Sequence, residues 1–261
     1  MFKRALNQKT CRDLPFEAFL DLAEEVGCVG VELRNDLGRP FFDWIAANEA
    51  AKMARSRGLT LLGLSEVYGF NVWDDERAAQ IQTLIDAAHA SGAQTISLIP
   101  TVDDRKTMPL RDVMREILPM LEGTNVLPLI EPIGFESSSL RTKAPLVEAI
   151  EAVGGTSRFK LVHDTFQHVI AGETEIFPEH TAMVHISGIS DPKVALDAEQ
   201  DAHRTLVDGD DRCGNVAQIA AFLEGGYDGA FSFECTEPKL IAAPNLTDIK
   251  TSFAFIDVHL Q

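Results

Sequence analysis

Four apolar runs in the second half of the chain each end on a residue that can bind a metal ion. The runs and their final residues are 126–130 with Glu131, 159–163 with Asp164, 182–184 with His185, and 230–233 with Glu234. A buried strand gains nothing from an ionised group at its last position, because an unpaired charge out of water is costly. Four such endings in succession therefore predict side chains that converge on one cation.

Apolar runs alternate with amphipathic segments along the whole chain. We expect strands over residues 4–7, 29–34, 59–64, 95–99, 126–131, 159–164, 182–185 and 229–234. Helical spacing of apolar residues predicts helices over 15–26, 42–57, 74–91, 110–121, 143–153, 216–223 and 246–258, with a short irregular connection after Asp164. This alternation is typical of an α/β protein, a (β/α)8 TIM barrel forming a single domain over residues 1–261. A doubly wound sheet is the alternative, but no glycine-rich nucleotide loop follows a strand.

The net charge of −17 over 261 residues limits the kind of partner. It repels phosphate backbones and anionic membranes, so we expect a small-molecule substrate, no nucleic acid and no membrane. The four cysteines have no C-x-x-C spacing, and no uncharged apolar run reaches membrane-spanning length. A cytoplasmic protein is therefore expected, either a monomer or a homo-oligomer.

In a barrel, the carboxyl-terminal strand ends share one mouth, where Glu131, Asp164, His185 and Glu234 would meet. Two residues earlier in each strand stands a residue that can be buried and would point the same way: Leu129, Val162, Met183 and Ser232. Three carboxylates and one imidazole favour one divalent ion, with Mn2+ the best match. Mg2+, Co2+ and Zn2+ are alternatives, although Zn2+ usually takes more His or Cys ligands.

The segments around these residues resemble the xylose isomerase-like barrels, particularly 2-keto-myo-inositol isomerase and the ketose 3-epimerases. The matching segments are Leu129-Ile130-Glu131-Pro132, Leu161-Val162-His163-Asp164-Thr165-Phe166, Val184-His185-Ile186 and Phe231-Ser232-Phe233-Glu234. The resemblance covers nearly the whole chain and implies a metal held by the same four residues. The chain departs from the family at Gln167, where a His is frequent and His168 comes one step later. It departs again at residues 207–210, which replace a Pro-Gly element.

The resemblance implies a metal-dependent sugar isomerase or epimerase of carbohydrate metabolism, such as inositol catabolism. Proton transfer through an enediolate would use Glu131 and Glu234 as acid and base. No phosphate-binding loop is visible, so an unphosphorylated keto sugar or keto-inositol is expected. Three alternatives remain: a lyase of the 3-dehydroshikimate dehydratase type, an endonuclease of the apurinic-site type, which needs more histidines, and a non-catalytic sugar-binding protein.

Three further residues are candidates for contact with the substrate. Arg204 lies in the long aperiodic connection over residues 188–213, which we expect to cover the mouth, and the resemblance also places an arginine before the last helix. His168 follows Asp164 into the mouth, and Trp73 after the third strand could form a wall for a sugar ring. We also expect Glu32 and Arg34, at the end of the second strand, to pair with each other.

Overall fold

The computed structural model describes residues 2–260 and forms a closed barrel of eight parallel strands in sequence order. The strands are β1 (Lys3–Asn7), β2 (Gly30–Arg34), β3 (Thr60–Tyr68), β4 (Thr95–Ile99), β5 (Leu127–Ile130), β6 (Lys160–Asp164), β7 (Thr181–Ile186) and β8 (Ala230–Phe233). Strand β8 pairs with β1 and closes the sheet. The predicted (β/α)8 barrel is confirmed.

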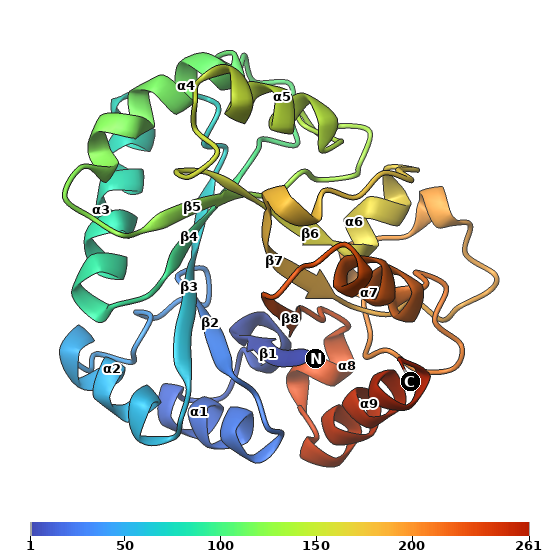
Figure 1. Cartoon of the computed structure of the whole chain (residues 1–261). Coiled ribbons are helices and arrows are strands. Elements are labelled where there is room, and N and C mark those ends of the chain that lie inside the picture. The colour runs from blue at the N-terminus through green and yellow to red at the C-terminus, as the bar shows by residue number, and fades with distance from the viewer. Residues whose placement is uncertain (1, 261) are drawn as a thin grey trace.

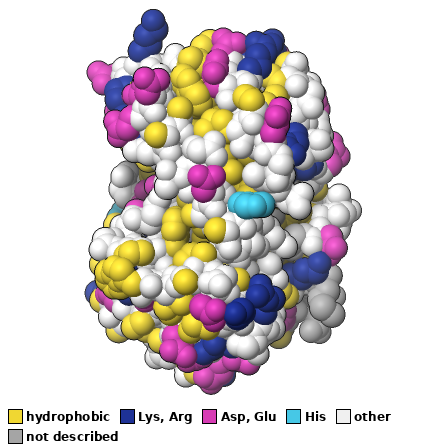
Figure 2. Space-filling view, turned by 90° about the vertical axis from the view of Figure 1, so that its left-hand side faces the viewer, with side chains coloured by type: hydrophobic (Ala, Val, Ile, Leu, Met, Phe, Trp, Pro, Cys, Tyr) yellow, Lys and Arg dark blue, Asp and Glu magenta, His cyan; other side chains and the backbone are white. Residues whose placement is uncertain are grey.

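Helices follow the strands and cover the outside of the barrel (Figure 1). They are α1 (Phe16–Glu25), α2 (Ala47–Ser56), α3 (Asp75–Ser91), α4 (Leu110–Ile117), α5 (Ala144–Ala152), α6 (Thr165–Ile170), α7 (Asn215–Glu224), α8 (Pro238–Ala242) and α9 (Leu246–His259). Among the described residues, no helix is long and apolar enough to cross a membrane. On the face drawn in Figure 2, acidic and basic side chains are interspersed with apolar ones.

The apolar core has two parts, as expected for a sheet closed on itself. The larger part lies between the strands and the surrounding helices, and includes outward-facing strand residues such as Val184 and Phe231. The smaller part fills the barrel interior and consists of Ala5, Leu129, Val162, Met183 and Ala230. Because side chains alternate along a strand, residues two positions beyond these point into the barrel mouth.

Helix α2 begins five residues later than predicted, at Ala47. Asp43 and Trp44 have positive φ angles of 49° and 67°, which a right-handed helix does not contain. The turn that they form contacts the first turn of α1: Asp43 Oδ2 accepts a hydrogen bond from the backbone N–H of Phe16 at 2.6 Å.

Helix α6 occupies part of the connection predicted to be irregular. It has six residues and begins directly after β6, without an intervening loop. Asp164 is its N-cap, and Oδ1 accepts a hydrogen bond from the backbone N–H of Gln167 at 2.9 Å. This short helix fixes the orientation of the Asp164 carboxylate, because one of its oxygens is committed to the cap.

The long connection after β7 is more ordered than its sequence suggests. It contains two 3-10 helices, Leu196–Ala198 and Asp201–His203, and an antiparallel bridge between Gly188 and Thr205. A Cβ at Gly188 would lie 2.7 Å from the carbonyl oxygen of Leu206, so the two arms of the connection approach closely. The bridge returns the chain to the barrel mouth just after Arg204.

Candidate metal centre and active site

The barrel brings the four predicted ligands together at the carboxyl-terminal ends of its strands. Asp164 ends β6 and His185 lies in β7, whereas Glu131 and Glu234 directly follow β5 and β8. One possible ligand atom from each residue lies within 4.8 Å of all the others, and all four side chains are buried. Strand alternation explains this convergence, because each residue has the inward parity of its strand.

The imidazole of His185 is oriented by Glu32, a buried carboxylate in β2 whose Oε2 lies 3.1 Å from Nε2. Because an ionised carboxylate only accepts hydrogen bonds, Nε2 carries the hydrogen. The other ring nitrogen, Nδ1, has no hydrogen-bond partner among residues 2–260. It faces carboxylate oxygens of Glu131 at 3.7 Å, Asp164 at 3.9 Å and Glu234 at 3.5 Å.

An imidazole nitrogen and three carboxylate oxygens facing one another in a buried space favour positive charge among them, and Arg204 supplies part of it through Asp164 and Glu234. A proton on Nδ1 is one solution: burial opposes it, but Glu32 and Glu234 outweigh burial and raise the pKa of His185 well above its usual value. A metal ion is the other solution, and the residues present fit one. The oxygen-rich donor set suits a divalent ion such as Mn2+ or Mg2+, so the four side chains could hold one.

Comparison with known sequences places the barrel in a family. The sequence profile described as "Xylose isomerase-like TIM barrel" matches residues 20–258. The chain belongs to this family. No curated protein matches the sequence.

Several solved structures are similar to this chain over nearly its whole length. A xylose isomerase domain-containing protein from Salmonella typhimurium is 26% identical with a TM-score of 0.90, covering 99% of this chain and 97% of that one. An IolI protein with a bound zinc atom is 18% identical with a TM-score of 0.85, covering 99% and 98%. A D-psicose 3-epimerase from Clostridium cellulolyticum, solved with D-tagatose, is 16% identical with a TM-score of 0.72, covering 100% of both chains. At these identities the last two show a shared fold.

The two glutamates of this family member have different electrostatic surroundings. Burial raises the pKa of Glu131 to about 8; the charge of His185 opposes the shift, whereas Glu234 and Asp164 add to it. Burial also acts to raise the pKa of Glu234, but His185 and Lys9 outweigh it and hold that pKa well below its usual range. The site therefore favours a protonated Glu131 and an ionised Glu234.

Arg204 is buried inside the site rather than extended from a solvated loop, with only 2% of its surface exposed. Its Nη2 donates to Asp164 Oδ2 and lies 3.2 Å from Glu234 Oε2, and its Nε donates to Ser187 Oγ at 2.9 Å. The guanidinium also stacks over the ring of Phe166, 5.2 Å from the centroid. The predicted approach of Arg204 to the mouth is thus seen, and its contact with substrate stays a prediction.

Arg34 is a site residue that the sequence analysis missed. Its Nη1 donates to Glu234 Oε1 at 3.0 Å and its Nη2 donates to Glu66 Oε2 at 2.6 Å. The expected pair between Glu32 and Arg34 is wrong, because Glu32 contacts His185 instead. A signal was available: both residues share the inward parity of β2, so both had to point into the mouth.

A small cavity of about 180 Å³ opens beside the cluster. Two ligands, Glu131 and Glu234, are exposed to it. The apolar part of its wall consists of Ile99, Val102, Ile133 and Phe135. The polar part consists of Lys9, Glu66, Tyr68, Gln167, Asp201 and Arg204. A cavity of this size and mixed lining suits a small polar molecule.

The two other predicted substrate residues do not line this cavity. His168 is buried on α6, where its Nδ1 lies 3.0 Å from Lys143 Nζ and its ring lies 4.9 Å from that of His163 between centroids, tilted by 44°. Trp73 is partly buried against the core between helices and strands. Their contact with substrate stays a prediction that the observed positions do not support.

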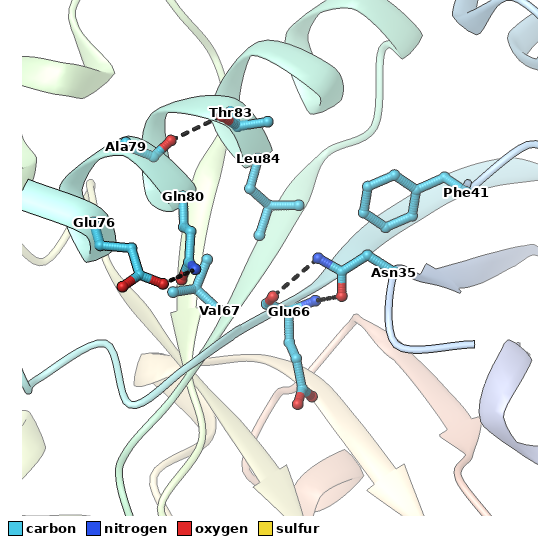
Figure 3. A pocket seen from close by; sticks show the side chains of 9 residues that line it. All are labelled: Asn35, Phe41, Glu66, Val67, Glu76, Ala79, Gln80, Thr83 and Leu84. Carbon is cyan, nitrogen blue, oxygen red and sulfur yellow. Dashed lines mark hydrogen bonds between the residues drawn. The ribbon is translucent and has the colours of Figure 1, made fainter. Parts of the chain in front are cut away.

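A larger open groove of about 510 Å³ lies between α3 and the loop after β2 (Figure 3). The side chain of Asn35 exchanges two hydrogen bonds with the backbone of Glu66, at 2.9 and 3.0 Å. In Figure 3 the Glu66 carboxylate points away from Asn35, on the side where it meets Arg34. The groove and the cavity thus share Glu66 as a wall, and its carboxylate contacts Arg34 beside the cavity.

Proposed function

We propose that this protein is a divalent-metal-dependent isomerase or epimerase of a small unphosphorylated keto sugar or keto-inositol. The observation that carries the proposal is the placement of two carboxylates, Glu131 and Glu234, in one cavity at the cluster that could hold a metal. They follow β5 and β8, on well-separated parts of the barrel rim. Such a pair can remove a proton from one face of a carbon and return a proton elsewhere.

A bound divalent ion would supply electrophilic polarisation of the substrate carbonyl. The surroundings of the two glutamates support different roles for them in the proposed reaction. Glu234 is held by Arg34 and Arg204 as an ionised carboxylate, which suits the base that removes the proton next to the carbonyl. Glu131 forms no ion pair with an arginine in the described residues, which suits the group that first takes up a proton and then returns it to the substrate. Reprotonation of the same carbon on its other face gives an epimer, and reprotonation of the neighbouring carbon gives an isomer.

The cavity lining supports a neutral polyol as the substrate class. Lys9 and Gln167 offer hydrogen-bond donors, whereas Glu66 and Asp201 offer acceptors, and a hydroxyl group can satisfy either kind. The excess of carboxylates around the cavity disfavours a phosphate group. The family also contains a D-psicose 3-epimerase solved with D-tagatose, which is a free ketose.

Solvent deuterium exchange tests the reaction. With Mn2+ present, wild type should introduce deuterium next to the carbonyl of a ketose or inosose, and Glu234→Gln should abolish the exchange. Glu224→Gln, an exposed site at the end of α7, serves as the matched control and should retain it. Absence of exchange across a panel of D-tagatose, D-psicose and inososes would refute the proposal. Formation of an aromatic chromophore from 3-dehydroshikimate would favour a lyase instead.

Metal content tests the site independently of any substrate. After dialysis, wild type should retain about one divalent ion, and Asp164→Asn should retain much less because it removes a charged oxygen ligand. Equal metal content in the two proteins would contradict the assignment of Asp164.

A further inference from the structure

The sheet is least continuous next to two of the ligands. Strands β5 and β6 are in register over only two pairs, Leu129 with Lys160 and Ile130 with Leu161. Beyond that point β6 continues to Asp164 and pairs with β7 alone. The loop that carries Glu131 and the strand end that carries Asp164 are therefore not joined by ladder hydrogen bonds, so their spacing must be set in another way.

Gln167 crosses this gap. Its backbone N–H donates to Asp164 Oδ1 at 2.9 Å, and its side-chain Oε1 accepts from the backbone N–H of Gly134 at 2.9 Å. Gly134 lies three residues after Glu131, and a Cβ there would lie 2.3 Å from the carbonyl oxygen of Gln167. Only a glycine at position 134 permits this approach of the loop to the backbone of α6.

We propose that Gln167 is a positioning residue that joins the Glu131 loop to the Asp164 helix cap and thereby sets the spacing of these two ligands. The contact with Gly134 also fixes how the amide is turned. A backbone N–H can only donate, so Oε1 must face Gly134 and the Nε2 donors face away.

The Nε2 group of Gln167 has no protein hydrogen-bond partner in the described residues, although only 4% of the residue's surface is exposed. Because Gln167 lines the cavity, this amide offers two neutral donors beside the metal cluster. Gln167 therefore also donates to a substrate oxygen, and unlike an imidazole it does so without a change of protonation state. This second role rests on the proposed function, whereas the joining role does not.

Two substitutions separate the roles. Gln167→Met removes both the acceptor for Gly134 and the donors for the cavity, whereas Gln167→Glu keeps an acceptor for Gly134 and, as a carboxylate at pH 8, removes the donors. With Co2+ as the probe, Gln167→Met should bind roughly tenfold more weakly and change the visible absorption spectrum. Gln167→Glu should bind Co2+ at least as tightly as wild type, since it adds a negative charge. Gln82→Met, at a half-buried position of α3 whose side chain donates only to Asp86 on the same helix, is the control and should behave as wild type.

Hydrogen exchange at the Gly134 amide measures the hydrogen bond from Gly134 to Gln167 directly, without metal and without an activity assay. The exchange should be at least about tenfold faster in Gln167→Met than in wild type or Gln167→Glu. Gly134→Ala disturbs the same contact through the Glu131 loop, because its Cβ would clash with the backbone of Gln167. It should weaken Co2+ binding and change the visible spectrum as Gln167→Met does, even if Gln167→Met fails to fold. Wild-type exchange in Gln167→Met, or a wild-type Co2+ spectrum in either Gln167→Met or Gly134→Ala, would overturn the joining role.

The donor role is tested on a keto sugar that wild type turns over. Gln167→Glu should lower kcat/KM about tenfold with Co2+ binding retained, because one hydrogen bond to substrate is lost. Unchanged kcat/KM would refute the donor role. If wild type turns over no keto sugar, the proposed function fails, while the Co2+ and exchange measurements still decide the joining role.

Discussion

Metal binding by this barrel should depend steeply on pH, because protons occupy the site that the metal would take. Burial raises the pKa of Glu131 to about 8, and the carboxylates around His185 raise the pKa of its imidazole as well. At neutral pH the metal-free cluster therefore holds at least one proton that a metal must displace. Raising the pH removes this competitor and should tighten binding.

The size of the effect follows from the Glu131 pKa of about 8. Competition by this one proton weakens the apparent metal affinity roughly 100-fold at pH 6 but only about twofold at pH 8. The affinity should therefore rise about 50-fold between these pH values, or about 2.3 kcal/mol, with a further increase if His185 also releases a proton.

Titration calorimetry with Mn2+ at pH 6, 7 and 8, in buffers of different ionisation enthalpy, gives both the affinity and the number of protons released. We expect about one or two protons released at pH 6 to 7. Glu131→Gln binds more weakly but should release fewer protons than wild type. An affinity that is flat from pH 6 to 8, with no proton released, would refute the argument.

The raised pKa of Glu131 also predicts that the metal-free protein becomes less stable as the pH rises. A carboxyl whose pKa rises from 4.5 to about 8 on folding contributes stability that is present below pH 4.5 and lost as the pH rises through 8. For this group alone, the metal-free protein should lose stability over the range in which metal binding tightens. Thermal unfolding with and without Mn2+ should show curves that diverge as the pH rises, and parallel curves would contradict this account.

Three substitutions test the groups around the ligands. Glu32→Gln should weaken Mn2+ binding roughly tenfold, because the charge that orients His185 is lost, and calorimetry showing wild-type affinity would contradict this. Arg34→Met should lower the free energy of unfolding by about 2 kcal/mol in urea, because it removes one of the two arginines that contact buried Glu234, and an unchanged midpoint would contradict it. Arg204→Ala should impair turnover yet bind Mn2+ at least as tightly as wild type, because it removes a competing positive charge; weaker binding would argue that Arg204 organises the ligands.

The barrel and the convergence of Glu131, Asp164, His185 and Glu234 were predictable because both follow from strand alternation. Residues such as Val162 and Met183 are apolar and inward, so Asp164 and His185 two positions later had to share their direction. The same rule applied to β2 identifies Glu32 as a site residue, because Glu32 has the inward parity of that strand. Strand alternation therefore predicts site residues in β2 as well as at the ends of the last four strands.

Other features depended on contacts that periodicity cannot reveal. Helix α6 has only six residues, and its N-cap Asp164 is also the last residue of β6, so the segment is too short for an amphipathic pattern. The start of α2 was misplaced because Asp43 and Trp44 adopt positive φ angles, which residues of these types rarely do. Arg204 lies in the long connection after β7, so the sequence could place it near the mouth, but its burial against Asp164 and Glu234 depends on the bridge that returns this connection to the barrel.

The charges at the site favour a divalent ion over a monovalent one. Four carboxylates at the mouth are almost completely buried, and two guanidiniums share their surroundings: Glu32, Glu131, Asp164 and Glu234, with Arg34 and Arg204. With every carboxyl ionised and His185 neutral, this set carries two uncompensated negative charges. Asp36 and Glu66 also contact Arg34, but their side chains are 39% and 21% exposed, so water screens them. One divalent ion would make the buried set neutral, whereas a monovalent ion would leave a charge that only a retained proton could cancel.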